Sequence, residues 1–201
     1  MIAIIDYDAG NVKSVEKALQ FLGQEAVLTR DKELLLSADK VILPGVGAFG
    51  NAMDKLYQYG LVDVIRQIVE KETPFLGICL GLQLMFESSE ESPGVSGLGL
   101  LKGRIVRIPE KEGLKVPQIG WNDLQFPKKS RLFKDFQGGE YVYFVHSYYL
   151  QATDESDVAA TTEYGVHIHA AVERDNVFAC QFHPEKSADV GLKILKNFID
   201  L

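Results

Sequence analysis

The chain has 201 residues, of which 46% are hydrophobic and 24% charged, a size and composition that predict a single domain over residues 1–201. Its formal net charge of −7 argues against binding to nucleic acid or to an acidic membrane, and leaves small neutral or zwitterionic substrates and protein partners. The N-terminus carries no basic segment ahead of an apolar stretch, and no apolar run reaches the roughly 18 residues of a membrane span, so we expect a cytoplasmic protein.

Short β-type runs alternate with helical patterns in the first half of the chain. The runs are IAIID, EAVL, KVIL and PFLGI, at residues 2–6, 25–28, 40–43 and 74–78. The first is followed by an amphipathic pattern from Val12 to Leu22, which predicts a helix that ends at Gly23. Strands that alternate with helices indicate right-handed βαβ units and a mainly parallel sheet.

From about Gly103 the pattern changes to strands without intervening helices. These strands are predicted in GRIVRIP, YVYFVHSYYLQA, HAAVE and VFACQF, at residues 103–109, 141–152, 169–173 and 177–182. The sequence ERDN at 173–176 indicates a hairpin turn, and residues 188–201 form a closing amphipathic helix. We therefore expect an α/β fold, an open and mainly parallel sheet flanked by helices, with antiparallel strands added in the C-terminal half.

Two loops follow strands of the predicted parallel sheet, at the carboxyl ends where such sheets bind ligands. The loop PGVGAFG, residues 44–50, follows the third strand, and its glycines allow backbone N–H groups to face outward. Cys79 follows the fourth strand. We expect both loops to lie on the ligand-binding side of the sheet.

Cys79 lies in GICLG, residues 77–81, a G-x-C-x-G form of the nucleophile elbow. In that motif a strained turn between strand and helix holds the nucleophile clear of the sheet, and the helix N-terminus favours the thiolate. The alternative is that Cys79 is a small buried residue of an apolar strand, because free cysteine is among the most buried residue types. With two cysteines in the chain, a disulfide framework is not expected.

A second candidate group is the segment QFHPEKS, residues 181–187, at the end of the last strand. If the strand continues through His183 and Glu185, their side chains leave on the same side, and Glu185 can orient His183 as a base for Cys79. Read alone, the segment could be an ordinary strand exit with a surface acid. Three independent features, the elbow cysteine, the glycine loop and the His-x-Glu pair, together favour a catalytic triad.

The chain resembles the class I, or triad, glutamine amidotransferases, whose glutaminase domain carries G-x-C-x-G and H-P-E in this order. The blocks that carry the resemblance are DYDAGN, PGVGAFG, GICLGLQLMF, IGWND, YFVHSYY, TTEYG and QFHPEKS. They span nearly the whole chain. Within the family they are most similar to the glutaminase subunits of histidine biosynthesis, which pass ammonia to a cyclase subunit with a (β/α)8-barrel fold.

The resemblance implies that glutamine is the substrate and that Cys79, His183 and Glu185 are catalytic. It places the oxyanion hole at the N–H of Leu80 and in the loop at Val46, whose peptide must reorient before the hole is complete. The residues expected to hold the rest of glutamine are Gly45, Gly47, Gln83, Glu91, Ser147 and Tyr148. For Glu91 an alternative stays open, because in SSEESPG it could be a solvated acid of a flexible loop.

A glutaminase of this type needs a partner over the mouth of its site, because ammonia must reach its acceptor without being lost to water. The contact residues predicted for that partner are Asn11, Trp121, Asn122, Tyr143 and Lys186. For the aromatic ones the alternative is core packing, but Trp121 follows what looks like a glycine turn and precedes polar residues.

Neither a cofactor nor a metal ion is expected. His167 and His169 form an H-x-H pair without further ligands nearby, Cys180 is expected in the core, and His146 as a packed, hydrogen-bonded histidine. Two other functions stay open: a catalytically silent scaffold of the same fold, and a free-standing cysteine hydrolase that needs no partner.

Overall fold

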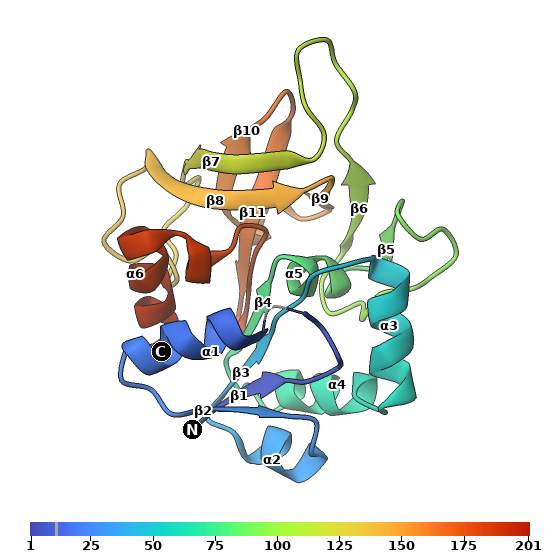
Figure 1. The fold of residues 1–201 in the computed structure, drawn as a ribbon, viewed down its shortest axis with the longest axis vertical. Helices are drawn as coiled ribbons and strands as arrows, with labels where there is room; N and C mark the ends of the chain where they lie inside the picture. The colour runs from blue at the N-terminus through green and yellow to red at the C-terminus, as the bar shows by residue number, and fades with distance from the viewer. Residues whose placement is uncertain (11) are drawn as a thin grey trace.

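The computed structural model describes residues 1–10 and 12–201, and its main element is a large mixed sheet. The strands of this sheet are β1 Ile2–Ile5, β2 Ala26–Thr29, β3 Lys40–Leu43, β4 Phe75–Ile78, β5 Ser88–Ser89, β6 Gly103–Arg107, β9 Tyr148–Ala152, β10 Val158–Glu163, β11 His167–Arg174 and β12 Val177–Cys180. Their order in space is β2-β1-β3-β4-β12-β11-β9-β6-β5, and β10 pairs with β11 beside this path (Figure 1).

The sheet is parallel in one half and mostly antiparallel in the other. Strands β2, β1, β3, β4 and β12 run parallel, and β11, β9 and β6 follow with antiparallel pairings. The predicted fold class is confirmed. Strand β12, late in the sequence, pairs with β4, so it brings the end of the chain beside Cys79.

Helices cover both faces of the parallel half, since alternate residues of each strand point to opposite sides. The helices are α1 Val12–Phe21, α2 Lys32–Ser37, α3 Phe49–Gln58, α4 Val62–Glu70, α5 Leu80–Leu84 and α6 Ala188–Ile199. On one face Ile4 of β1 packs in a buried cluster with Leu19 of α1 and Phe198 of α6. On the other face Ile5 joins a cluster with Ile65 of α4. The site is therefore built on a strand layer held between two helix layers.

A second, two-stranded sheet lies above the end of the first. It pairs β7 Gln118–Leu124 with β8 Glu140–His146 in antiparallel register (Figure 1). The single strand predicted over residues 141–152 is wrong, because the chain leaves β8 at Ser147 and enters β9 of the main sheet. The predicted glycine turn before Trp121 is also wrong, since Gly120 continues β7 with φ +135°.

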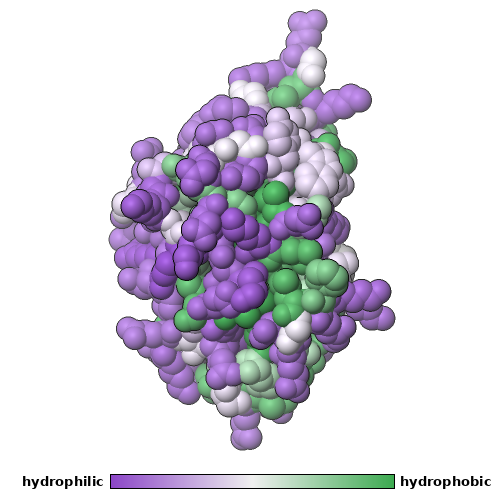
Figure 2. All heavy atoms as spheres, turned by 90° about the vertical axis from the view of Figure 1, so that its left-hand side faces the viewer, coloured by the Kyte–Doolittle hydropathy of each residue, from purple (hydrophilic) through white to green (hydrophobic). Residues whose placement is uncertain are grey.

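The surface carries few large apolar side chains. Phe21, Tyr57, Ile119, Trp121 and Tyr141 are more than half exposed, and the last three belong to the two-stranded sheet. Figure 2 shows one side of the molecule, where hydrophobic atoms gather in the middle of a hydrophilic surround. None of the helices described for residues 1–10 and 12–201 is long and apolar enough to cross a membrane.

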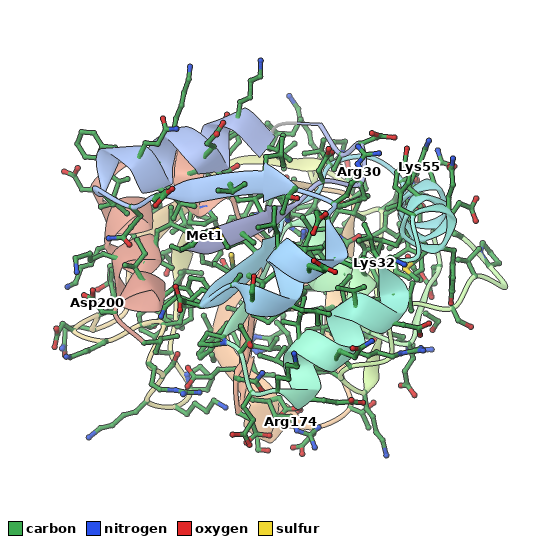
Figure 3. All side chains as sticks on the ribbon, turned by 90° about the horizontal axis from the view of Figure 1, so that it is seen from below. Met1, Arg30, Lys32, Lys55, Arg174 and Asp200 are labelled. Atoms are coloured by element: carbon green, nitrogen blue, oxygen red, sulfur yellow. The ribbon has the colours of Figure 1, made fainter. Side chains whose placement is uncertain are left out.

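The N-terminal loop after β1 is held by charges from two other elements. Asp8 has φ +65° and accepts hydrogen bonds from Arg30 and Tyr59, with Lys55 3.4 Å away. Figure 3 shows Arg30 and Lys55 side by side at one corner of the molecule. These contacts lower the pKa of Asp8 to about 2, the Tyr59 hydrogen bond contributing most. They hold Asp8 in place beside Arg30 and Tyr59.

Candidate active site

Cys79 occupies a strained turn between β4 and α5. Its backbone has φ +55° and ψ −108°, a conformation that residues other than glycine rarely adopt. Its N–H still donates to the carbonyl oxygen of Cys180 at 2.8 Å, so the turn begins inside the sheet. A Cβ on Gly81 would lie 1.9 Å from the carbonyl oxygen of Leu43, which explains the glycine at that position. The predicted elbow is present.

His183 and Glu185 form a buried pair beside this turn. Nδ1 of His183 lies 2.8 Å from Oε1 of Glu185, and their side chains are 2% and 1% exposed. The route to this contact differs from the one predicted. Strand β12 ends at Cys180, and a 3-10 turn, η2 Pro184–Lys186, brings Glu185 back against the imidazole. The pairing thus results from a turn, and strand alternation does not produce it.

The two histidines near the cavity differ in charge. Burial lowers the pKa of His183, but its neighbours Cys79 and Glu185 outweigh that effect and raise the pKa to about 9. At neutral pH the imidazolium form is therefore favoured beside the Cys79 sulfur. Burial lowers the pKa of His146 to about 4, so that imidazole is neutral. Its Nδ1 faces the carbonyl oxygen of Tyr148 at 2.8 Å and its Nε2 faces Gln118, which confirms the prediction of a packed histidine.

A cavity of about 310 Å³ opens at this point, a volume within the range of small-ligand sites. Its lining residues are Val46, Gly47, Cys79, Leu80, Gln83, Glu91, Pro117, Val145, His146, Ser147, Tyr148 and His183. Most of the predicted site residues are thus brought together in one pocket. Two of them lie behind its wall: Glu185 supports His183, and Gly45 packs so closely that an added Cβ would lie 2.3 Å from Oη of Tyr7.

The glycine loop after β3 is in a conformation without an oxyanion hole. The N–H of Leu80 donates to the carbonyl oxygen of Gly45 at 3.4 Å, so this donor is occupied. Because a peptide bond is planar and trans, the Val46 N–H of the same peptide points the opposite way, away from Leu80. The two donors predicted for the hole therefore do not converge here. Gly47, with φ +104°, supplies the backbone freedom next to that peptide.

Glu91 has a structural partner as well as a place in the cavity. Its Oε2 accepts the backbone N–H of Phe49 at 2.8 Å, and the neighbouring Ser92 accepts that of Gly50 at 2.9 Å. Both N–H groups belong to the first turn of α3, where carboxylates are favoured by unsatisfied donors and by the helix dipole. The alternative of a solvated acid in a flexible loop does not describe Glu91, which is partly buried in this contact.

Sequence reasoning missed Gln181 and Gln118, two buried glutamines around the site. Gln83 donates from Nε2 to the carbonyl oxygen of Tyr148 at 3.1 Å and to Oε1 of Gln181 at 3.0 Å. Gln181 in turn places its Nε2 3.7 Å from the sulfur of Cys79. A signal was available in the sequence, because Gln181 is a polar residue at the end of the apolar run VFAC and a buried amide needs partners.

The predicted partner-contact residues have different surroundings. Trp121 is 52% exposed and meets Tyr143 edge-to-face, with ring centroids 6.2 Å apart. Lys186 is exposed on the η2 turn. Asn122 points to the other side of β7 and donates to the carbonyl oxygen of Glu163 at 2.9 Å. Asn11 lies outside the described residues.

The remaining histidine and cysteine predictions concern residues that do not line the cavity. Within the described part of the chain, no cluster of three or more His, Cys, Asp or Glu side chains is arranged to hold a metal ion. His169 accepts the backbone N–H of Ala152, and His167 pairs with Glu163. Cys180 is fully buried in β12, and burial raises the pKa of its thiol, which confirms it as a core residue.

Comparison with known proteins agrees with this geometry. The family model of class-I glutamine amidotransferases matches residues 3–201. The chain belongs to this family. Its fold is shared with a solved glutamine amidotransferase at a TM-score of 0.78 and 23% identity, covering 100% of this chain and 98% of the other. A structure of PurLQS from Thermotoga maritima matches at a TM-score of 0.77 and 22% identity, covering 99% and 97%.

Several relatives of higher identity carry one name, imidazole glycerol phosphate synthase subunit HisH. The relative from Caldanaerobacter subterraneus is 50% identical over 198 residues, which cover 98% of this chain and 97% of the relative. The relative from Moorella thermoacetica is 52% identical over 200 residues, covering 100% and 94%. The relative from Methanocaldococcus jannaschii is 47% identical over 201 residues, covering 100% of both chains. This amidotransferase is thus similar along its whole length to one branch of the family.

Proposed function

We propose that this chain is the glutaminase subunit of an imidazole glycerol phosphate synthase. It hydrolyses glutamine to glutamate and ammonia, and the ammonia passes to a cyclase subunit in histidine biosynthesis, in the cytoplasm. The observation that carries the proposal is the buried His183–Glu185 pair beside the strained Cys79, in a cavity of substrate size. The full-length similarity to HisH subunits supports the pathway.

In the first half of the reaction, the Cys79 thiolate attacks the side-chain carboxamide carbon of glutamine. A C–S bond forms, and the carbonyl oxygen becomes an oxyanion. The imidazolium of His183 gives its proton to the departing nitrogen as the C–N bond breaks, which leaves a glutamyl thioester and ammonia. Glu185 holds the ring through Nδ1, so that Nε2 is the nitrogen that exchanges protons.

In the second half, a water molecule attacks the thioester carbonyl. His183, now neutral, takes a proton from this water as the C–O bond forms and returns to the imidazolium state. The C–S bond then breaks and Cys79 leaves as a thiolate. The sum of both halves is glutamine plus water giving glutamate plus ammonia, and the same imidazole serves as acid and then as base.

The oxyanion hole forms when the peptide between Gly45 and Val46 rotates. Rotation withdraws the Gly45 carbonyl from the Leu80 N–H and turns the Val46 N–H toward the cavity, so two donors then face the oxyanion. One such donor typically contributes about 2.7–4 kcal/mol to lowering the barrier. The conformation described above is therefore a resting state, and the rotation is the step that a partner would have to promote.

The backbone end of glutamine meets acceptors and donors at the far side of the cavity. The carboxylate of Glu91 faces the α-ammonium group, together with Oε1 of Gln83, since Nε2 of Gln83 is already committed to Tyr148 and Gln181. Main-chain groups of Gly47, Ser147 and Tyr148 receive the α-carboxylate. Gly45 acts from behind the wall, through its mobile carbonyl.

The cyclase subunit, a (β/α)8 barrel, docks over the two-stranded sheet and the η2 turn. Trp121 is exposed and Tyr143 half-buried, and together they supply aromatic contact area on the two-stranded sheet, while Lys186 supplies an exposed charge on the η2 turn. Asn11 and Asn122 complete the predicted contact set, Asn122 from the side of β7 that faces Glu163. Covering the cavity keeps ammonia away from water.

The proposal is tested by measuring glutamate release by the purified chain. The rate is measured for the chain alone and with a cyclase barrel subunit that carries its ribonucleotide ligand. We expect a low rate alone, a strong rise with the liganded partner, and loss of at least about 10³-fold in Cys79→Ala. Cys180→Ala is the matched control and should keep the rate within about threefold, because this thiol is buried in the core. Full activity without any partner would indicate a free-standing hydrolase. No activity under either condition would indicate a scaffold.

A further inference from the structure

Gln181 is a fully buried polar side chain in contact with the proposed nucleophile. It follows β12, where its backbone N–H donates to Ala170 at 2.8 Å, and its relative exposure is 0%. Its carboxamide nitrogen lies 3.7 Å from the Cys79 sulfur, within the range of an N–H···S hydrogen bond. The triad mechanism described above assigns no role to this group.

The orientation of the Gln181 carboxamide is set by a second amide. Its Oε1 accepts a hydrogen bond from Nε2 of Gln83 at 3.0 Å. Gln83 cannot turn its own amide around without losing this bond and the one to the carbonyl oxygen of Tyr148 at 3.1 Å. Nε2 of Gln83 is a donor, so the atom of Gln181 that faces it must be the acceptor Oε1. The Nε2 of Gln181 is then the atom that faces the sulfur, and it presents an N–H there.

An N–H donor at this position distinguishes the two protonation states of Cys79. A thiolate accepts a hydrogen bond more strongly than a neutral thiol, and a donor that bonds the charged form favours that form. His183 provides positive charge in the same place, whereas Gln181 provides a directed dipole without a net charge. The two groups come from one strand exit, residues 181–183, and reach the sulfur by different interactions.

We propose that Gln181, held by Gln83, donates its carboxamide N–H to the Cys79 sulfur and thereby stabilises the thiolate that attacks glutamine. The proposal rests on Cys79 being the nucleophile of the proposed function. Gln181 keeps both of its protons throughout, so no atom is transferred. The hydrogen bond weakens as the sulfur enters the thioester and strengthens again when the thiolate leaves, which assists release of glutamate.

The test is the rate at which iodoacetamide alkylates Cys79 between pH 5 and 10, followed by mass spectrometry of the Cys79 peptide. In Gln181→Met, which keeps length and burial but has no N–H, the midpoint of the alkylation profile should rise by about one pH unit. Below the midpoint, alkylation should then be about tenfold slower than in the wild type, because the thiolate fraction falls tenfold per unit. In Gln181→Glu the carboxylate lies close to the sulfur, and the rise should be larger.

Gln118→Met is the matched control, because Gln118 is another buried glutamine that bonds His146 and has no contact with the sulfur. Its alkylation midpoint should equal that of the wild type. If Gln181→Met does not fold, Gln181→Glu and Gln83→Met carry the test, the latter because it releases the orientation of Gln181. An unchanged midpoint in folded Gln181 variants, or an equal rise in Gln118→Met, would overturn the proposal.

The alkylation assay uses neither glutamine nor a partner, so its result is separate from that of the glutaminase assay. If the wild type fails to release glutamate with the liganded cyclase, the proposed function fails whatever the alkylation shows. If the wild type is active and the midpoint does not move, only the role of Gln181 fails. In active variants the acidic limb of the kcat/KM profile should move to higher pH together with the alkylation midpoint. A purely structural loss would lower thermal stability but would move neither the acidic limb nor the alkylation midpoint.

Discussion

Two cysteines and two histidines in or beside the candidate site allow a comparison. Cys79 and His183 lie in turns, at the β4–α5 elbow and at the start of η2, whereas Cys180 and His146 lie inside the strands β12 and β8. Cys79 and Cys180 are neighbours, joined by a backbone hydrogen bond, and both are buried. Only Cys79 has a strained backbone and a charged histidine beside it. His183 and His146 differ in the same way: neighbouring groups raise the pKa of His183, whereas burial lowers the pKa of His146. Burial alone therefore does not set the backbone strain of these cysteines or the charge of these histidines; the turns and the neighbouring groups do.

The largest effect that sharpens this comparison is expected in Glu185→Gln. Removing the carboxylate takes away one of the two groups that raise the pKa of His183, so the alkaline limb of the stimulated kcat/KM profile should move to lower pH. Loss of the orienting partner should also lower kcat by about 10²–10⁴-fold. The measurement is glutamate release against pH in the complex.

A matched control for this variant is Glu163→Gln, which removes a carboxylate from the exposed pair with His167. It should change neither the rate nor the profile. Equal effects of the two substitutions would mean that overall charge, rather than the buried contact, sets the state of His183.

The elbow strain can be tested with Gly81→Ala. The added Cβ would lie 1.9 Å from the carbonyl oxygen of Leu43, a backbone atom that can move only if β3 and α5 separate. We expect the free energy of unfolding to fall by about 3 kcal/mol or more. Gly113→Ala, at φ +79° but with open space around it, should cost only about 1 kcal/mol. Urea denaturation measures both, and equal costs would show that the elbow is not tightly packed.

A smaller effect is expected from His146. Its pKa of about 4 in the folded chain lies below the ordinary value, so between pH 6.5 and 4 the unfolded chain binds a proton that the folded chain does not. Folding stability should therefore fall as the pH drops through this window, by about 2–3 kcal/mol at most. In His146→Gln the loss between the two pH values should shrink by that amount. His167→Gln, at an exposed site, should leave the loss unchanged, and the opposite ranking would contradict the prediction.

Much of the parallel half of the fold and the core of the site could be predicted from the sequence. Strand and helix periods differ clearly there, and the glycines around Cys79 signal a turn that only a special backbone can make. The strand break at Ser147 could not be predicted, because residues 141–152 contain no glycine, proline, asparagine or aspartate that would indicate a turn. An apolar pattern tells which residues are buried but not to which sheet each part is hydrogen-bonded.

The contacts of the site that sequence reasoning missed join segments that lie far apart in the sequence. Glu91 caps a helix that begins 42 positions earlier, and Gln83 meets Gln181 across 98 positions, separations that no local spacing encodes. The resting position of the Gly45 carbonyl depends on one peptide orientation, which the glycines permit but do not select. The sequence therefore predicted most of the side chains that meet at the candidate site, whereas their orientations needed the structure.

The break at Ser147 also has a mechanical meaning. The chain that carries Tyr143 in β8, opposite Trp121, passes through Ser147 into the wall of the cavity at Tyr148, so the small sheet and the cavity wall share one stretch of backbone. The two sheets on either side of Ser147 are separate except for an isolated bridge between Gln125 and Thr161. Because Ser147 lines the cavity, a tilt of the small sheet against the large one would move this residue and change the width of the cavity.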